Sequence, residues 1–229
     1  MKKDRNISRR TFLAVAGGAV VNIGLPGVFV QLTDAEQLAM AADTRPDGRP
    51  RLPPGQVAVK NIRDMGGSPG NATAADWTLR VHGEVERPVV LSYRDLLNLD
   101  QTHITCDIHC VTGWTLMDSN WSGIRLSTIL DMVGPRKNAG FVIFEAAADY
   151  TSNIPISEAG KNDVILAHSF FGEKLLQSHG APVRALVPDR YFYKSAKWVD
   201  GIKVTSRDEP GFWEQRGFSN SADPWKEER

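Results

Sequence analysis

Residues 102–121, THITCDIHCVTGWTLMDSNW, constrain the fold of this chain most, because they include both cysteines, two of the five histidines and two of the six tryptophans. Successive side chains of a β-strand point to opposite faces. Read with this period, one face carries Thr102, Ile104, Cys106, Ile108 and Cys110, and the other carries His103, Thr105, Asp107 and His109. Turn-prone residues 111–113 follow, so we expect the strand to end at Cys110, with loop residues closing over its thiol.

Four possible metal ligands, His103, Cys106, His109 and Cys110, lie within eight residues. Structural zinc sites need a second ligand pair further along the chain, and the sequence has no other cysteine. A disulfide is also disfavoured, because four residues of strand separate the Cα atoms by about 13 Å, whereas a bridge needs them within about 7 Å. We therefore expect Cys106 to be a packing residue and Cys110 to be a ligand, with its neighbour His109 favouring the thiolate.

The N-terminus resembles a twin-arginine export signal. Arg9 and Arg10 precede an apolar run at residues 12–32, and residues 39–41 (Ala-Met-Ala) offer a cleavage site of small residues. An ordinary secretory signal and a retained membrane anchor remain alternatives, since the run is long enough to span a bilayer. Residues 1–41 are thus predicted to direct the protein to the periplasm. Twin-arginine export carries folded proteins, usually with a cofactor already inserted, so the signal also predicts a cofactor.

The remaining chain is long enough for one domain of class α+β, in which short strands mix with a few short helices. Residues 42–56 read as an irregular surface arm, and residues 57–229 form the domain. Strands are expected at residues 57–62, 77–83, 89–91, 102–110, 141–148, 164–167, 183–188 and 198–205. Helices are expected from Ser92, which has a capping-box spacing to Asp95, and at residues 127–133, after a turn at residues 122–123. Three aromatic residues in the tail at 208–229 predict that it packs back on the domain, with partner binding as the alternative.

A second group of polar residues occupies residues 179–198. Arg184, Lys194, Ser195 and Lys197 supply the kinds of donor that bind a phosphate. A solvated basic face is the competing interpretation, and spacing alone does not decide between them. The formal net charge is zero, with 27 basic and 27 acidic residues, so any anion site is local and a nucleic-acid partner is not indicated.

Several short motifs occur in an order that resembles the sulfite-oxidase-like molybdopterin oxidoreductases, closest to a short bacterial branch of that family. They are CVTGW at 110–114, WSG at 121–123, HGAPVR at 179–184, KSAKW at 194–198, GFWE at 211–214 and DPW at 223–225. The resemblance implies a sulfite-oxidase fold and a molybdenum-molybdopterin cofactor, with Cys110 as the metal ligand and catalytic residue. It also implies cofactor contacts from Asn61, His109, Cys110, His179, Arg184, Ser195, Ala196 and Lys197. His179 matches the sulfite oxidases, whereas periplasmic methionine-sulfoxide reductases have Asn there.

The expected function is transfer of an oxygen atom to or from a small sulfur- or nitrogen-centred substrate. The chain has no haem-binding C-x-x-C-H motif and no flavin or nicotinamide fingerprint. Electrons are therefore expected to pass to or from a separate partner, such as a cytochrome or a membrane haem protein. The alternative is a non-catalytic pterin- or metal-binding module of a larger redox assembly.

Overall fold

The structure is a computed structural model that describes residue 39 and residues 42–228. The predicted signal at residues 1–41 lies outside the described residues, apart from residue 39. Among the described residues, no helix combines the length and the apolar character needed to cross a membrane.

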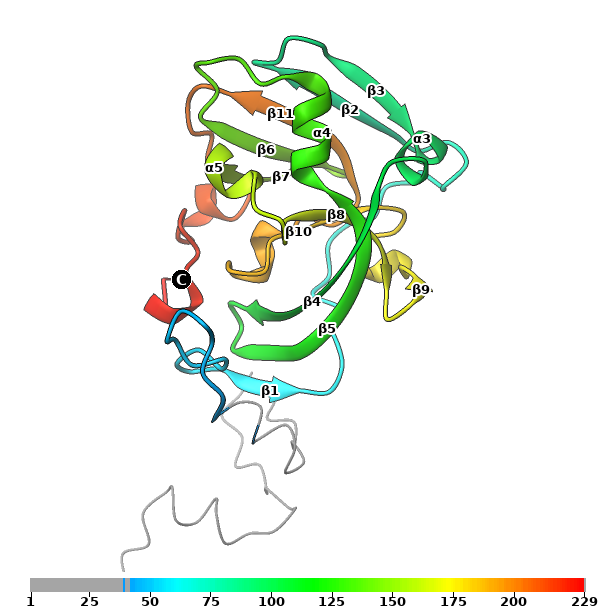
Figure 1. Cartoon of the computed structure of the whole chain (residues 1–229). Coiled ribbons are helices and arrows are strands. Elements are labelled where there is room, and N and C mark those ends of the chain that lie inside the picture. The colour runs from blue at the N-terminus through cyan, green and yellow to red at the C-terminus, as the bar shows by residue number, and fades with distance from the viewer. Residues whose placement is uncertain (1–38, 40–41, 229) are drawn as a thin grey trace, which may run out of the picture.

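Two mixed β-sheets form the protein (Figure 1). The six-stranded sheet contains β1 (Val57–Val59), β4 (Gln101–Cys110), β5 (Trp114–Arg125), β8 (Ile165–Phe170), β9 (Glu173–Lys174) and β10 (Arg184–Leu186). The five-stranded sheet has the order β3 (Val89–Ser92), β2 (Thr78–Gly83), β11 (Val199–Thr205), β6 (Phe141–Ala146) and β7 (Tyr150–Pro155). Parallel pairing of β1 with β5 and of β2 with β11 occurs beside antiparallel pairs. The predicted α+β class is confirmed.

Short α-helices accompany the sheets in the described part of the chain, among them α3 (Tyr93–Leu97), α4 (Leu126–Val133) and α5 (Ile156–Ala159). The predicted capping box is present at α3, where the Ser92 hydroxyl accepts a hydrogen bond from the Asp95 backbone N–H and the Asp95 carboxylate accepts one from the Ser92 backbone N–H. Four short 3₁₀ helices lie later in the chain, at Gln177–His179, Phe192–Lys194, Glu214–Arg216 and Pro224–Lys226. The last two belong to the tail.

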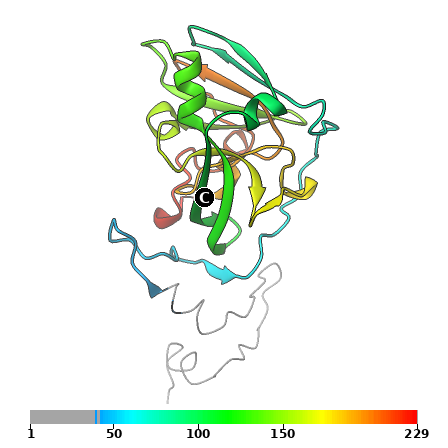
Figure 2. The same cartoon turned by 45° about the vertical axis from the view of Figure 1, so that its right-hand side comes forward.

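Strand β5 differs from the sequence prediction. We expected a turn at residues 122–123, but β5 runs unbroken from Trp114 to Arg125 and pairs with β1, β4 and β8. Gly123 is needed here for close packing, because a Cβ atom on it would lie 2.1 Å from the backbone oxygen of Leu166 in β8. In Figures 1 and 2, β4 and β5 extend together away from the five-stranded sheet toward the N-terminal arm.

Two hydrophobic clusters fill the interior. The larger cluster packs α4 against the five-stranded sheet, with Ile129, Val142 and Ile202 fully buried in it. The smaller cluster lies under the six-stranded sheet and includes Cys110, Trp114, Trp121 and Phe192. We call it the cysteine cluster. It places the thiol of Cys110 in an apolar environment that is formed by strands distant in sequence.

The arm and the tail meet beside the hairpin end at which β4 joins β5 (Figure 1). Arg51 of the arm donates a 2.8 Å hydrogen bond to Asp107 of β4, and the indole N–H of Trp225 donates a 2.7 Å hydrogen bond to the Pro50 carbonyl. The guanidinium groups of Arg45 and Arg49 lie 4.7 and 3.9 Å from the Trp225 ring centroid. The arm is irregular, but it is not only a surface segment, because Pro53 and Gln56 are buried.

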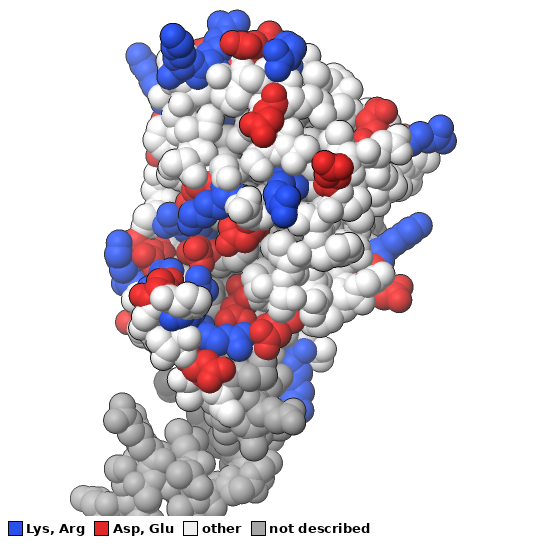
Figure 3. Space-filling view, in the orientation of Figure 1, with Lys and Arg blue, Asp and Glu red and all other residues white. Residues whose placement is uncertain are grey.

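Acidic and basic side chains are interspersed on the face drawn in Figure 3. Ion pairs between described residues, such as Lys161–Glu158 and Arg45–Asp189, likewise place opposite charges side by side. This face therefore has no extended region of one charge sign, as expected for a chain of zero formal net charge.

Candidate functional site

Cys110 ends β4, as predicted, and its side chain belongs to the cysteine cluster. The thiol lies 3.1 Å from the Thr112 hydroxyl, and the residue is 5% exposed. Burial raises the pKa of the Cys110 thiol, whereas hydrogen bonds to Thr112 and the positive charge of Arg63 lower it. Cys110 is thus a nearly enclosed thiol with one cation near it, and a soft metal is the partner that most favours its thiolate form.

The predicted alternation along β4 is confirmed. Ile104, Cys106, Ile108 and Cys110 all contact the cysteine cluster. Cys106 is partly buried, and burial raises the pKa of its thiol to about 12, so it stays protonated. Both cysteines are free thiols. These features match the expected packing role of Cys106.

His109 lies on the other face of β4 from Cys110. Its ring is fully buried, packs edge-on against Trp225 with centroids 5.0 Å apart, and bonds to the Thr115 hydroxyl at 2.9 Å through Nδ1. Burial lowers the pKa of His109 to about 4, so the ring is neutral at pH 7. A neutral ring on the opposite face does not stabilise the Cys110 thiolate, which corrects that part of the sequence interpretation.

Arg184 is the central basic residue of the second group. It begins β10, is 1% exposed, and donates 2.8 Å hydrogen bonds to the backbone oxygens of His179 and Ser195. Its guanidinium group lies 4.1 Å from the Phe192 ring centroid and 5.5 Å from that of Trp121, both in the cysteine cluster. Burial lowers the pKa of Arg184 to about 9, so it is still a cation at neutral pH. Within the described residues, no carboxylate forms an ion pair with it.

His179 and Lys197 adjoin Arg184 through a tightly packed glycine. A Cβ atom on Gly180, which has φ +108°, would lie 3.0 Å from the Arg184 Cβ and 3.1 Å from the Lys197 Cα. Lys197 Nζ donates a 2.9 Å hydrogen bond to the Ser178 carbonyl, contacts the Gly66 carbonyl and forms a 3.4 Å ion pair with Asp64. Burial and the charges of Arg184 and Lys197 lower the pKa of His179. The structure therefore brings three of the predicted donors to one corner.

Ser195, Ala196 and Asn61 contribute less through their side chains. The Ser195 hydroxyl accepts a 2.9 Å hydrogen bond from the Val187 N–H, and the buried Ala196 packs in the larger hydrophobic cluster. Asn61 follows β1 and is exposed. The hydrogen bonds of Arg184 and Lys197 within the described part of the chain do not include Asn61.

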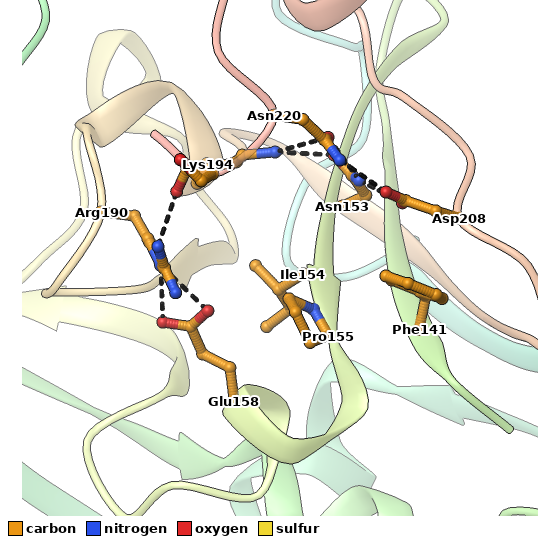
Figure 4. A pocket seen from close by; sticks show the side chains of 10 residues that line it. Phe141, Asn153, Ile154, Pro155, Glu158, Arg190, Lys194, Asp208 and Asn220 are labelled. Atoms are coloured by element: carbon orange, nitrogen blue, oxygen red, sulfur yellow. Dashed lines mark hydrogen bonds and ion pairs between the residues drawn. The ribbon is translucent and has the colours of Figure 1, made fainter. Parts of the chain in front are cut away.

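Lys194 does not belong to the Arg184 corner, which corrects the predicted phosphate-binding group. Its ammonium group is 1% exposed, pairs with the Glu214 carboxylate and donates a 2.7 Å hydrogen bond to Asn153. Lys194 and Asn153 border a separate cavity of about 180 Å³, shown in Figure 4, in which Arg190 also pairs with Glu158. Lys194, at the end of the short helix Phe192–Lys194, therefore lies at this cavity, whereas Lys197, three residues later, lies at the Arg184 corner.

Comparison with known proteins decides the family. Residues 65–213 match the family described as the oxidoreductase molybdopterin binding domain. The chain is a member of this family. It is 37% identical over 181 residues to the uncharacterized oxidoreductase YuiH of Bacillus subtilis (strain 168), covering 78% of this chain and 91% of that protein. A molybdopterin-dependent oxidoreductase is therefore the identity that the matched residues support, as the sequence motifs predicted.

Two further relatives extend the comparison. The protein-methionine-sulfoxide reductase catalytic subunit MsrP of Burkholderia mallei (strain ATCC 23344) is 28% identical over 261 residues, with 94% of this chain and 76% of that protein covered. The crystal structure of the sulfane dehydrogenase SoxCD from Paracoccus pantotrophus superposes with a TM-score of 0.58 at 23% identity. That match covers 67% of this chain and 43% of the SoxCD chain, and it supports the fold alone.

The residues of this molybdopterin-dependent oxidoreductase fit its cofactor. A molybdenum-molybdopterin needs a soft protein ligand for the metal and cations for its phosphate. Cys110 supplies a thiol enclosed by apolar side chains, and Arg184 supplies a buried cation without a carboxylate partner among the described residues. A buried cation of this kind lowers the stability of the folded protein unless an anion binds beside it.

Sequence reasoning missed several residues that the fold brings to this site. Arg63 approaches Cys110, Asp64 pairs with Lys197, and the amide of Gln56 donates a 3.1 Å hydrogen bond to the Cys110 carbonyl. Gln56 was assigned to the surface arm, and no local pattern marks it. Trp121 and Phe192 were visible as aromatic residues, but only their packing on Arg184 shows their role.

Proposed function

We propose that this oxidoreductase transfers an oxygen atom to or from a small sulfur-centred substrate, with Cys110 as the protein ligand of molybdenum. The observation that carries the proposal is the pairing of an enclosed thiol, Cys110, with an enclosed and otherwise uncompensated cation, Arg184, around one apolar cluster. When bound, molybdenum-molybdopterin supplies the two-electron oxygen-transfer chemistry. The protein supplies orientation, charge and exclusion of water.

Cys110 would hold the metal through its thiolate. The buried thiol releases its proton less readily than a thiol in water, and Arg63 and the Thr112 hydrogen bonds partly offset this effect. Trp114 and the rest of the cysteine cluster exclude water from one side of the sulfur. The thiol therefore has an apolar setting that favours a single, non-exchanging metal bond.

Arg184, Lys197 and His179 would hold the phosphate and the pterin. Arg184 is anchored by two backbone carbonyls and by the faces of two aromatic rings, so its position costs little further ordering on binding. Lys197 is anchored by backbone carbonyls and Asp64. Ser195, Ala196 and Asn61 complete the proposed set, Ser195 through the hydroxyl proton that its bond to Val187 leaves available.

The substrate class is supported by the name of one relative. This similar protein is named a methionine-sulfoxide reductase, an enzyme that acts at sulfur. It is named as a catalytic subunit, which supports a separate redox partner for this chain as well. A nitrogen-centred oxide is the remaining member of the predicted substrate class.

The test is elemental analysis of protein from a molybdenum-replete host, followed by turnover of a small sulfoxide with a reduced viologen dye as electron donor. We expect about one molybdenum per chain and measurable sulfoxide reduction in the wild-type protein, and no turnover in Cys110→Ala. Zinc in place of molybdenum, or equal turnover by Cys110→Ala, would contradict the proposal.

Export through the twin-arginine route belongs to the same proposal and is supported by Arg9 and Arg10 before the apolar run. Replacing both with lysine should leave the precursor in the cytoplasm with its cofactor bound. The matched control replaces Lys2 and Lys3 with arginine, which keeps the charge and should leave export unchanged. Arrival of the Arg9 and Arg10 double variant in the periplasm would contradict this route.

A further inference from the structure

A buried hydrogen-bonded chain leads from His109 to the backbone of Cys110. His109 Nδ1 lies 2.9 Å from the Thr115 hydroxyl, which donates at 3.3 Å to the Gln56 side-chain oxygen. The Gln56 side-chain nitrogen in turn donates at 3.1 Å to the Cys110 carbonyl. His109 and Thr115 are fully enclosed and Gln56 is 7% exposed, so the three side chains form one enclosed polar chain.

The direction of every bond in this chain is fixed by chemistry. A backbone carbonyl only accepts, so the Gln56 amide must turn its nitrogen toward Cys110 and its oxygen toward Thr115. The Thr115 hydroxyl then uses its proton on Gln56 and accepts from His109. His109 is therefore protonated at Nδ1. One arrangement of protons satisfies all three links, which makes the chain rigid.

The chain ends on a peptide group that other contacts also restrain. The Cys110 carbonyl accepts a second hydrogen bond, at 3.0 Å, from the Gly113 N–H of the turn. Both acceptor positions of this oxygen are thus in use. Because the Cys110 Cα lies in the plane of this peptide group, the chain restrains the backbone from which the thiol side chain projects, without touching the sulfur.

Polar groups in an apolar interior lower stability unless they are bonded, and here each of the three side chains bonds to the next group of the chain. Its members come from the arm, β4 and β5, and Trp225 of the tail covers the His109 ring. Ser119 makes the comparable contact to the backbone of the other cysteine. It is equally buried in β5, and its hydroxyl donates at 2.6 Å to the carbonyl of Cys106, the packing cysteine.

We propose that His109, Thr115 and Gln56 are positioning residues that set the orientation of the Cys110 thiolate at the metal. The inference rests on the proposed function, in which Cys110 is the metal ligand. It gives His109 a role that its sequence position next to Cys110 did not reveal, since His109 acts through Thr115 and Gln56 rather than on the thiol or the cofactor.

The test uses the full-length protein from a molybdenum-replete host, with Thr115→Val, which keeps the shape and removes the hydroxyl. Thr115→Ser restores the hydroxyl, and Ser119→Ala is the matched control that removes a buried hydroxyl beside the other cysteine. The measurements are molybdenum content, the visible absorption band of the thiolate–metal bond, and kcat and KM with sulfoxide and the reduced dye.

We expect Thr115→Val to keep its molybdenum, shift the absorption band and lower kcat about tenfold with KM unchanged, as for other residues that orient metal ligands. Thr115→Ser and Ser119→Ala should resemble the wild type in band and kcat. Gln56→Leu, which removes the donor from the arm instead, should reproduce the Thr115→Val spectrum and serves as the second variant if Thr115→Val does not fold.

Two results would overturn the inference. One is a wild-type band and kcat in both Thr115→Val and Gln56→Leu, and the other is an equal change in Ser119→Ala. Failure of the proposed function itself looks different, because the wild-type protein would then lack molybdenum or would show a band that persists in Cys110→Ala.

Discussion

Replacing Arg184 with methionine separates the effect of this buried cation on the free energy of unfolding from its effect on cofactor binding. Burial lowers the pKa of Arg184 well below its usual value, to about 9, and at about 1.4 kcal/mol per pKa unit this corresponds to about 5 kcal/mol against the buried cation. Because the folded-state pKa lies below the unfolded one, the full cost applies at every pH below about 9, neutral pH included. Methionine removes that cost and keeps most of the packing against Trp121 and Phe192.

The substitution also removes donors from the carbonyls of His179 and Ser195, each a loss of about 1–3 kcal/mol. The two effects have similar size and opposite sign. The free energy of unfolding of protein from a molybdenum-starved host should therefore change little in Arg184→Met. Cofactor binding has no such compensation, since a charge-assisted hydrogen bond contributes about 1.5–3 kcal/mol, or about ten- to a hundredfold in affinity.

The assay is urea unfolding of the cofactor-free protein, together with molybdenum and pterin content when the cofactor is limiting. Arg190→Met is the matched control, because Arg190 is a partly buried arginine paired with Glu158 away from the Arg184 corner. It should lose stability and keep its cofactor. The reasoning is refuted if Arg184→Met retains as much cofactor as Arg190→Met, or if it unfolds far more readily without cofactor.

Three further predictions concern packing and the metal ligand. Cys106→Ala should lower the free energy of unfolding by about 1 kcal/mol and keep the thiolate absorption band. Cys110→Ala should stay folded but lose both the band and turnover. Loss of the metal from both variants would mean that the two thiols act as a pair. Lys194→Met should destabilise the fold by about 3–5 kcal/mol in urea unfolding, because it leaves the buried Glu214 carboxylate unpaired, and cofactor per folded chain should not change. Gly123→Ala should cost about 3 kcal/mol in thermal unfolding, since its Cβ would meet the β8 backbone; an unchanged melting temperature would contradict this close packing.

The sequence determined the features that depend on local spacing. Alternation along β4 predicted that Cys106 and Cys110 share one face, and the capping box at Ser92 predicted the start of α3. The ordered motifs predicted the family and the α+β class. Each of these signals lies within a short stretch of chain, where the strand or helix period fixes the outcome.

Tertiary structure decided which partner each polar side chain meets. Arg184 and Lys194 read alike in the sequence, yet Glu214 of the tail neutralises Lys194, and no carboxylate among the described residues pairs with Arg184. Gln56 reaches the Cys110 carbonyl only because β1 lies parallel to β5. Such contacts join residues far apart in the chain, and their positions follow from how the sheets, arm and tail pack, which no local period encodes.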